Sequence, residues 1–237
     1  MCIRDRNILI NEKQIKLIKD EIIKEAVGFG FSIEYLKQLT SLKKRYDYCK
    51  QFLGNPIGRG SSRIVFQYDD NIVIKLALNK AGLAQNEEEY RYLDDNFINV
   101  FPKSYDYLSD LEDYKFIATE YVLPAKEEDF EHVFGFDFLT FCNIICTWES
   151  WKDSRFIIPY FNHKLKDEEM EYFTENIEDL REFEDYFLNY NVEGIGDLLR
   201  LSSYGMTNRN GQPEIVILDN GLNNEIYNKF YKHKMKK

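Results

Sequence analysis

Hydrophobic residues recur along this chain with two different periods, and the first region has the period of a helix. Over 7–53 they return every three or four positions among lysine and glutamate, which predicts amphipathic helices. Gly28 and Gly30 interrupt the pattern, and Ser32 is placed to cap a second helix with its hydroxyl group. We therefore expect an N-terminal helical extension before the rest of the fold.

The period changes after this extension, where short stretches rich in β-branched residues predict strands. Residues 63–68 and 71–76 are separated by two aspartates that tolerate a tight turn, so they predict a β-hairpin. A helical pattern covers 82–95, and 115–122 has the composition of a further strand. This order predicts a small sheet accompanied by one helix.

The rest of the chain returns to long helical patterns and ends in short elements. Residues 127–152 and 163–190 predict two long helices with a hydrophobic face and an acidic face. An Asn210-Gly211 turn and a strand over 214–218 follow them. Strands early in the chain and helices later are typical of an α+β protein.

The composition limits the classes of partner. The chain has 237 residues, which suits one domain or one bilobal unit. Its 41 acidic residues outnumber its 31 basic residues, so we expect neither nucleic acid nor an anionic membrane as a partner. The chain contains no apolar run of about 18 residues that could span a bilayer, so we expect a cytoplasmic protein.

The cysteines and histidines do not form the pattern of a zinc site. None of the four cysteines has a Cys-x-x-Cys spacing, and only three histidines are present. Cys142 and Cys146 lie four positions apart, on one face of a predicted helix beside Phe141 and Ile145. Packing in the core is therefore a simpler interpretation of these two cysteines than metal binding.

The first six residues resemble translated sequencing-adapter sequence. We set 1–6 aside as a non-native leader, with an ordinary start of the chain as the alternative. The interpretation of the fold therefore begins at residue 7.

A glycine-rich segment before the predicted hairpin is the first candidate for binding chemistry. Residues 57–65 read I-G-R-G-S-S-R-I-V, with Gly58, Gly60, Ser61 and Ser62 at the centre. Glycine lets a backbone approach a phosphate group closely, because no Cβ stands in the way. An ordinary hairpin loop is the alternative, and the glycines alone do not decide between the two.

A lysine within the hairpin strengthens the phosphate interpretation. Lys75 lies in the apolar stretch 72–76, and alternation places it with Val73 on one side of the sheet, where it needs an anion. The helical stretch 85–89 reads Q-N-E-E-E, and we choose Glu89 as the partner. An edge-strand lysine that reaches solvent is the alternative.

The glycine-rich hairpin, the strand lysine and the helix glutamate, in this order, resemble the protein-kinase-like superfamily. The G-x-G-x-S-R-x-V-F start and the Gln-Asn-x-x-Glu stretch are more closely similar to compact kinase-like proteins of bacteriophages. This resemblance implies a bilobal fold, with a small β-sheet N-lobe over 54–122 and a reduced, mainly helical C-lobe over 123–237. It also implies an ATP site in which the loop and Lys75 hold the phosphates and Glu89 holds the lysine.

The same resemblance implies two further borders of the nucleotide site. Glu120 and Val122 lie where the hinge between the lobes would run, and backbone groups there would contact adenine. Asp219 follows the strand 214–218 and is similar in position to the aspartate of Asp-Phe-Gly, which implies a ligand of Mg²⁺. A plain Asp-Asn-Gly turn is the alternative for Asp219.

The catalytic loop departs from the kinase pattern. The resemblance implies that Asp197 is the catalytic base, acting with Lys75. Five or six positions later, where kinases have a magnesium-binding asparagine, this chain has Ser202 and Ser203. We take Ser203 as the second candidate metal ligand, although a hydroxyl group is a poorer ligand than an amide. Asn208 replaces it only if the loop is rearranged.

Only 18 residues follow Asp219, which leaves no room for the helices with which protein kinases dock a peptide. Three interpretations stay open: an active phosphotransferase, a pseudokinase that binds a nucleotide or a host protein, and a structural α+β protein. We favour the phosphotransferase, using ATP and Mg²⁺ on a hydroxyl group of a protein or small molecule, and leave its activity open.

Overall fold

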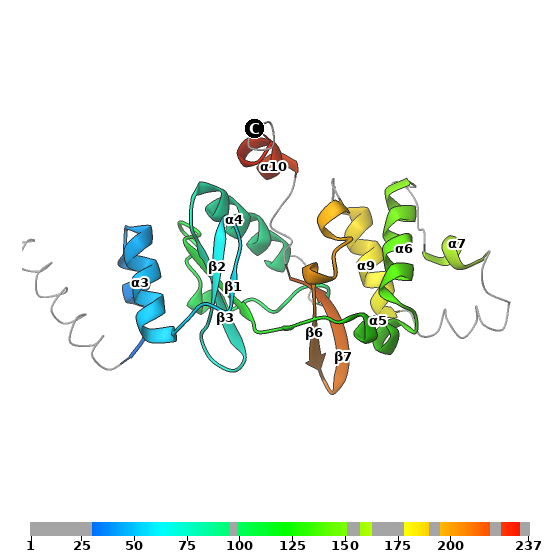
Figure 1. Cartoon of the computed structure of the whole chain (residues 1–237), viewed down its shortest axis with the longest axis horizontal. Helices are drawn as coiled ribbons and strands as arrows, with labels where there is room; N and C mark the ends of the chain where they lie inside the picture. The colour runs from blue at the N-terminus through cyan, green and yellow to red at the C-terminus, as the bar shows by residue number, and fades with distance from the viewer. Residues whose placement is uncertain are drawn as a thin grey trace, which may run out of the picture. The chain divides into compact units, whose positions relative to one another are not determined.

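The computed structural model describes residues 30–94, 99–150, 157–162, 178–189, 195–218 and 224–232. They belong to two units, 1–55 and 56–237, which we treat separately. The first unit contains α2 (Ile33–Gln38) and α3 (Leu42–Leu53), drawn in blue in Figure 1. The helical pattern predicted before residue 30 lies outside the described residues.

The predicted helix after Ser32 is a pair of short helices. Its start is confirmed, because the Ser32 hydroxyl accepts a hydrogen bond from the Tyr35 amide at 3.2 Å. α2 ends at Leu39, where the backbone becomes extended and the carbonyl accepts a hydrogen bond from Arg45 Nη1 at 2.7 Å. The second helix predicted within 7–53 is therefore interrupted between Gln38 and Leu42.

The second unit begins with a four-stranded antiparallel sheet in the order β1-β2-β3-β4. Its strands are β1 (Gly58–Arg59), β2 (Arg63–Gln67), β3 (Ile72–Ala77) and β4 (Phe116–Glu120). The predicted hairpin is confirmed, and in its turn Asp69 Oδ1 accepts a hydrogen bond from the Asn71 amide at 2.8 Å. β3 is buried along its whole length, so its lysine has to be satisfied inside the protein.

The predicted helix after the hairpin is α4 (Lys80–Asp94), which packs against β3 and β4 (Figure 1). Asn79 caps it, since its Oδ1 accepts hydrogen bonds from the amides of Ala81 at 3.0 Å and Gly82 at 3.1 Å. Gly82 lies so close to the glycine-rich loop that a Cβ would overlap the Ser62 carbonyl oxygen. The loop and the start of α4 are therefore in direct contact.

A second sheet has the order β5-β6-β7. Its strands are β5 (Leu123–Pro124), β6 (Tyr204–Arg209) and β7 (Gln212–Ile217). The predicted turn between β6 and β7 is confirmed, with φ values of 55° at Asn210 and 84° at Gly211. The chain changes sheets between β4 and β5, near the predicted boundary at residue 122. Contacts unite 56–237 as one unit, and its division into two lobes stays a prediction.

Helices α5 (Glu127–Phe134), α6 (Phe138–Ser150) and α9 (Glu178–Asn189) pack with the second sheet, and the mixed α+β class is confirmed. The other described α-helices after β5 are α7 (Ile157–Asn162) and α10 (Asn224–Phe230). The described 3₁₀ helices are η1 (Asp106–Leu108), η2 (Ile195–Asp197) and η3 (Leu201–Ser203). Among these, α10 packs against α4, and α5 packs against β7 and α6.

The prediction of one continuous helix over 127–152 is wrong. α5 ends at Gly135, which has a φ of 78° and donates its amide to the Glu131 carbonyl at 3.0 Å. Asp137 then accepts a hydrogen bond from the Thr140 amide at 2.7 Å, next to the start of α6. Of the predicted helix 163–190, α9 is the described part, and 163–177 lie outside the described residues.

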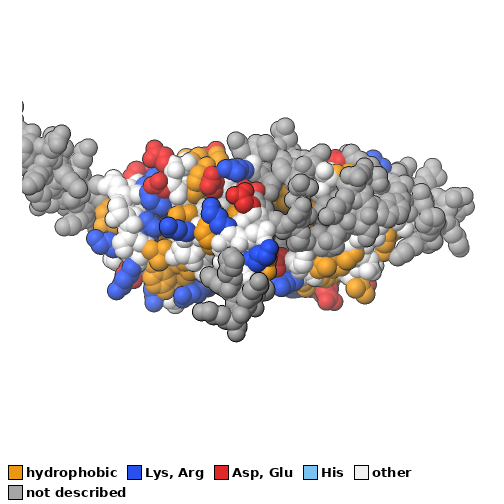
Figure 2. All heavy atoms as spheres, turned by 90° about the horizontal axis from the view of Figure 1, so that it is seen from above, with side chains coloured by type: hydrophobic (Ala, Val, Ile, Leu, Met, Phe, Trp, Pro, Cys, Tyr) orange, Lys and Arg blue, Asp and Glu red, His pale blue; other side chains and the backbone are white. Residues whose placement is uncertain are grey.

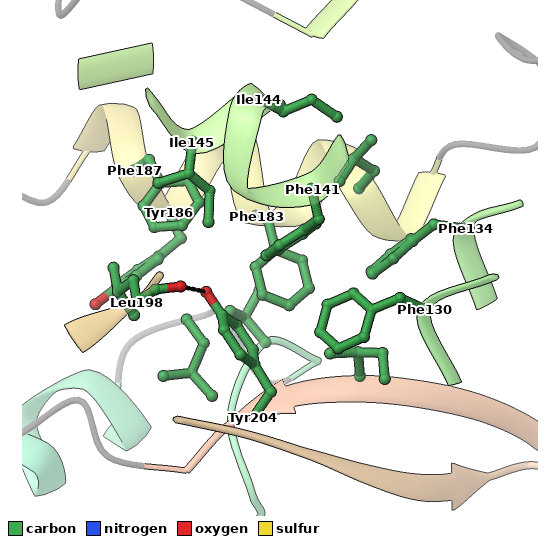
Figure 3. Packing of buried hydrophobic residues seen from close by; sticks show 14 of the residues in the cluster. Phe130, Phe134, Phe141, Ile144, Ile145, Phe183, Tyr186, Phe187, Leu198 and Tyr204 are labelled. Carbon is green, nitrogen blue, oxygen red and sulfur yellow. Dashed lines mark hydrogen bonds between the residues drawn. The ribbon is translucent and has the colours of Figure 1, made fainter. Parts of the chain in front are cut away.

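Aromatic rings form the core between α5, α6, α9 and the β6–β7 hairpin (Figure 3). Phe141 is buried and has its ring centroid 5.1 Å from that of Phe130 and 5.6 Å from that of Phe183. Tyr204 is also buried, and its hydroxyl donates to the Leu198 carbonyl at 2.7 Å. The hydroxyl group of Tyr204 is therefore paired, as a buried hydroxyl requires.

The cysteine prediction holds only for one of the two residues. Cys142 is half-buried, whereas Cys146 is exposed, so Cys146 does not pack in the core. On the face shown in Figure 2, hydrophobic, basic and acidic side chains are interspersed over the described residues. None of the described helices combines the length and the apolar character needed to cross a membrane.

Candidate functional site

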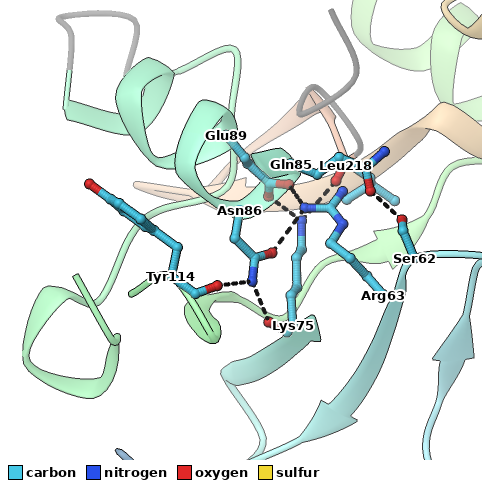
Figure 4. Close-up of polar contacts among 8 residues, drawn as sticks. All are labelled: Ser62, Arg63, Lys75, Gln85, Asn86, Glu89, Tyr114 and Leu218. Atoms are coloured by element: carbon cyan, nitrogen blue, oxygen red, sulfur yellow. Dashed lines mark hydrogen bonds and ion pairs between the residues drawn. The ribbon is translucent and has the colours of Figure 1, made fainter. Parts of the chain in front are cut away.

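Three charged side chains meet between the first sheet and α4 (Figure 4). Lys75 Nζ donates to one oxygen of Glu89, and Arg63 Nη1 donates to the other. The Glu89 side chain is 1% exposed, and those of Lys75 and Arg63 are 10% and 9% exposed. The structure therefore brings together the predicted lysine and glutamate, and their role toward a nucleotide stays a prediction.

Local structure fixes the rotation of α4 so that Glu89 faces β3. Asn86 lies three positions before Glu89, on the same face of the helix. Its Nδ2 donates to the backbone carbonyls of Lys75 at 3.3 Å and Tyr114 at 2.9 Å. These bonds join the helix to β3 and to the segment before β4, and Glu89 follows one turn later.

The glycine-rich loop is tied to the same helix. The Ser62 hydroxyl donates to Gln85 Oε1, and the Ser62 carbonyl accepts from the Leu78 amide at 2.7 Å. Asn79 Nδ2 donates to the Ser61 carbonyl at 3.1 Å. The predicted phosphate loop is therefore positioned by α4 and the residues just before it.

The electrostatic balance of the cluster is one carboxylate between two cations. Burial raises the pKa of Glu89, but the charges of Lys75 and Arg63 and their hydrogen bonds lower it by more, so its pKa lies below the usual value. Glu89 is therefore ionised at neutral pH. The described side chains of the cluster are two cations and one anion.

A cavity of about 290 Å³ opens beside this cluster. Its described lining residues are Gly60, Ser61, Ser62, Arg63, Val65, Lys75, Gln85, Leu218 and Tyr231. Lys75 Nζ also donates to the Leu218 carbonyl at 2.8 Å, so the end of the β7 segment borders the cavity. Asp219, the predicted Mg²⁺ ligand, is the next residue and lies outside the described residues. Gly58 belongs to β1, and it does not line the described part of the cavity.

The predicted catalytic loop has its own internal contacts. Ser203 is buried, and its hydroxyl donates to the Asp197 carbonyl at 2.5 Å. The Asp197 carboxylate pairs with Arg200 at 3.0 Å and its side chain is 47% exposed. Neither Asp197 nor Ser203 is among the described lining residues of the cavity. Their predicted roles as catalytic base and metal ligand stay predictions.

Glu120, a predicted hinge residue, takes part in a junction between the two sheets. Its carboxylate accepts hydrogen bonds from Thr207 Oγ1 at 2.6 Å and Arg209 Nη2 at 2.9 Å. Burial raises the pKa of Glu120, but these hydrogen bonds, one from the Lys103 amide and the charge of Arg209 lower it by more. Val122 is buried, and neither residue is in the described cavity lining, so their contact with adenine stays a prediction.

Two arginines in these networks were not predicted from the sequence. Arg63 stands where the kinase pattern has its third glycine and opens a strand whose next residues are apolar. That position was an available signal for an internal ion pair. Arg209 also has a buried side chain, but nothing in the polar sequence around it distinguishes it from a surface residue.

The described residues fit the polyphosphate of a nucleotide better than they fit Mg²⁺. Lys75, Arg63 and the glycine-loop backbone lie at the edge of the cavity, and their N–H donors suit an anion. No carboxylate is among its described lining residues, and no group of three His, Cys, Asp or Glu side chains gathers in the described part of the chain. The predicted ligand Asp219 lies outside the described residues.

The comparisons with known proteins add little to this geometry. No family model matches the sequence, and no curated protein matches it. A search of solved structures found similarity to the aminoglycoside phosphotransferase APH(2″)-IIa, in a ternary complex with streptomycin and ATP. The identity is 14%, the TM-score is 0.31, and the match covers 74% of this chain and 70% of that one. A TM-score this low does not establish a shared fold.

Proposed function

We propose that the protein binds ATP in the cavity beside Lys75 and transfers its terminal phosphate to a hydroxyl group, as a kinase-like phosphotransferase. One observation carries this proposal: a buried Lys75–Glu89 ion pair borders a cavity under a glycine-rich loop. Lys75 and Arg63 both line this cavity, and their charged N–H donors suit the oxygens of an anionic ligand.

Each site residue has a defined part in this proposal. Lys75 binds the phosphates and Glu89 orients it, while backbone amide groups of the loop residues Gly60 and Ser61 approach the phosphate oxygens. Asp219 would hold Mg²⁺, which would neutralise phosphate charge when bound, and Asp197 accepts the proton of the acceptor hydroxyl.

Further parts of the proposal concern the rim of the site. Gly58 gives the loop its flexibility and Ser62 anchors it, and backbone groups of Glu120 and Val122 contact adenine. Ser203 is the second candidate ligand of Mg²⁺. The acceptor is a protein or a small molecule with a free hydroxyl group.

Nucleotide binding is the first test of this function. ATP at 100 times its dissociation constant raises the unfolding free energy of a binder by about 2.7 kcal/mol, which a thermal melting curve detects. Lys75→Met should abolish the shift, whereas Lys80→Met, which removes an exposed lysine at the start of α4, should keep it. A wild-type melting curve that ATP leaves unmoved, with and without Mg²⁺, rejects the proposal.

Phosphate transfer is the second test, and it separates the enzyme from a pseudokinase. The pseudokinase is favoured by the Ser203 hydroxyl, which donates to a backbone carbonyl instead of facing the cavity. ATP labelled at the terminal phosphate is incubated with the protein, a bacterial lysate and a panel of polyhydroxyl compounds. Label transfer that Lys75→Met abolishes supports the enzyme, and binding without transfer supports the pseudokinase.

A further inference from the structure

We infer that Tyr231, which follows α10, is a ligand-contacting residue of this site and lies against the phosphate groups of the bound nucleotide. This inference rests on the proposed function and deepens it, because it adds a residue from a segment for which the sequence predicted no role in binding. Of the described residues that line the cavity, Tyr231 alone comes from the α10 segment.

The cavity corresponds to the phosphate end of the proposed nucleotide site. Its described lining includes Ser61 and Lys75, which are both proposed to bind phosphate. Glu120 and Val122, which are proposed to contact adenine, are not among the described lining residues. The volume of about 290 Å³ lies at the lower limit of the roughly 300–1,000 Å³ of pockets that enclose a whole small-molecule ligand. The cavity therefore has the size for part of a nucleotide, and its lining suits the phosphates.

The α10 segment holds Tyr231 at this end of the site. The helix packs against α4, which also contributes the lining residue Gln85, and Ile226 of α10 is only 6% exposed. The Tyr231 amide donates to the Tyr227 carbonyl at 2.9 Å, so the backbone continues the final turn of the helix. The two tyrosine rings also stack, with their centroids 6.5 Å apart and their planes inclined by 11°. The side chain is therefore a supported part of the cavity wall.

The position of Lys75 explains why the contact is with phosphate. Lys75 Nζ donates to the Leu218 carbonyl at 2.8 Å, and both residues line the cavity together with Tyr231. Two or three linked phosphate groups that reach the lysine fill most of so small a space, so they also meet the other lining residues. The expected contact uses the bulk of the tyrosine ring and does not depend on the partner of its hydroxyl group.

Protection of an introduced thiol tests the inference in the full chain. Tyr231→Cys is treated with a small neutral thiol reagent, and peptide mass spectrometry measures how fast the introduced thiol is modified. Tripolyphosphate at 100 times its dissociation constant occupies about 99% of the sites, so it should slow this modification by at least about tenfold. Adenosine, which has no phosphate group, should change the rate by less than about twofold.

A matched control variant separates direct contact from a general effect on α10. Asn228→Cys introduces a thiol at an exposed position of the same helix that is not among the described lining residues. Neither probe should change its rate of modification. Protection of both introduced thiols would mean that the ligand only stabilises α10, which overturns the inference. Protection by adenosine that equals that by tripolyphosphate, or no protection by tripolyphosphate, also overturns it.

A second variant decides if Tyr231→Cys does not fold. Tyr231→Trp places a larger ring in the cavity wall, so calorimetric titration should show tripolyphosphate binding weakened by about tenfold. Adenosine binding should stay within about twofold of the wild type. Tyr107→Trp, at a position that is 70% exposed, is the control and should leave both affinities within about twofold. Unchanged tripolyphosphate affinity in Tyr231→Trp overturns the inference.

Failure of the inference is distinguishable from failure of the proposed function. A wild-type protein that binds ATP, although tripolyphosphate does not protect the introduced thiol of Tyr231→Cys, contradicts the inference alone. Protection by tripolyphosphate in a protein that never transfers phosphate contradicts the phosphotransferase alone. A wild-type protein that binds neither ATP nor tripolyphosphate contradicts both.

Discussion

Two buried regions of the 56–237 unit are built on opposite chemistry. Beside the first sheet, Arg63, Lys75 and Glu89 form an ionic cluster at the edge of a cavity. Beside the second sheet, phenylalanine and tyrosine rings pack with centroid separations such as 5.1 Å between Phe130 and Phe141. In the aromatic region, all apolar surface that is removed from water stabilises the fold. The ionic cluster, in contrast, must first offset the loss of hydration of three charges.

The two regions differ in what they contribute: the aromatic region supports stability, and the ionic cluster is the candidate for function. The main contribution of aromatic packing is the hydrophobic effect, which is not directional. The rings therefore stabilise one another, and this region needs no ligand. The ionic cluster depends on each of its partners. A cluster of charges that is costly to bury and lies beside a cavity is the better candidate for a binding site. Substitutions in the two regions should therefore affect different measurements.

The largest loss of stability is expected in the aromatic region. Phe141→Ala removes a ring that is 1% exposed and leaves a cavity, so the unfolding free energy should fall by about 4 kcal/mol. Urea denaturation measures it. Leu139→Ala is the control, because this residue on the same helix is 68% exposed and should cost about 0.5 kcal/mol. Equal costs for the two variants would contradict the assignment of the core.

Glu89→Gln should produce a somewhat smaller loss of stability. It should also weaken ATP binding, because Glu89 orients Lys75 in the proposed site. The substitution leaves two buried cations without their anion, which should cost about 3 kcal/mol in urea denaturation. Glu87→Gln on the same helix removes an exposed pair with Arg91 and should cost about 0.4 kcal/mol. If Glu89→Gln is no more costly than Glu87→Gln, the ionic cluster does not hold α4 against the sheet.

Gly82→Ala tests the contact between the loop and α4. The added Cβ would overlap the Ser62 carbonyl oxygen, so the helix or the loop must shift, at a cost of about 2 kcal/mol. ATP affinity should fall as well, since Ser62 anchors the proposed phosphate loop. Gly196→Ala is the stability control, because a Cβ there meets nothing within 4 Å. A stable Gly82→Ala variant with unchanged affinity would show that the loop position is unimportant.

The sequence predicted those elements whose formation depends on neighbouring residues in the chain. The β2–β3 hairpin follows from two β-branched stretches with an Asp-Asp turn, and the Asn210-Gly211 turn requires two positive φ values that these residues tolerate. The pairing of Lys75 with Glu89 was also predictable, because a lysine inside an apolar strand needs an anion, and a helix with glutamates follows.

The features that the sequence did not predict include ion pairs between residues far apart in the chain and a helix end within a continuous hydrophobic pattern. The hydrophobic pattern continues without a break across Gly135, where α5 ends. Periodicity alone therefore predicted one continuous helix in place of α5 and α6. Arg209 pairs with Glu120 at a separation of 89 residues, and its neighbours in the sequence give no indication of burial. Arg63 stands at the third glycine position of the kinase pattern, and its pairing with Glu89 depends on how α4 packs.

Acid should weaken the ionic region of the protein. The pKa of Glu89 is lowered in the folded protein from the usual value of 4.5, so its ionised form stabilises the fold above that pH. This contribution is lost as the pH falls from 4.5 through the folded pKa. Urea denaturation at pH 7, 5, 4 and 3 should therefore show the wild type losing its advantage over Glu89→Gln in acid. Phe141→Ala has no change in charge, so its cost should stay nearly constant over the same range. An advantage of the wild type over Glu89→Gln that is the same at pH 7 and pH 3 would contradict an ionised Glu89 in the folded protein.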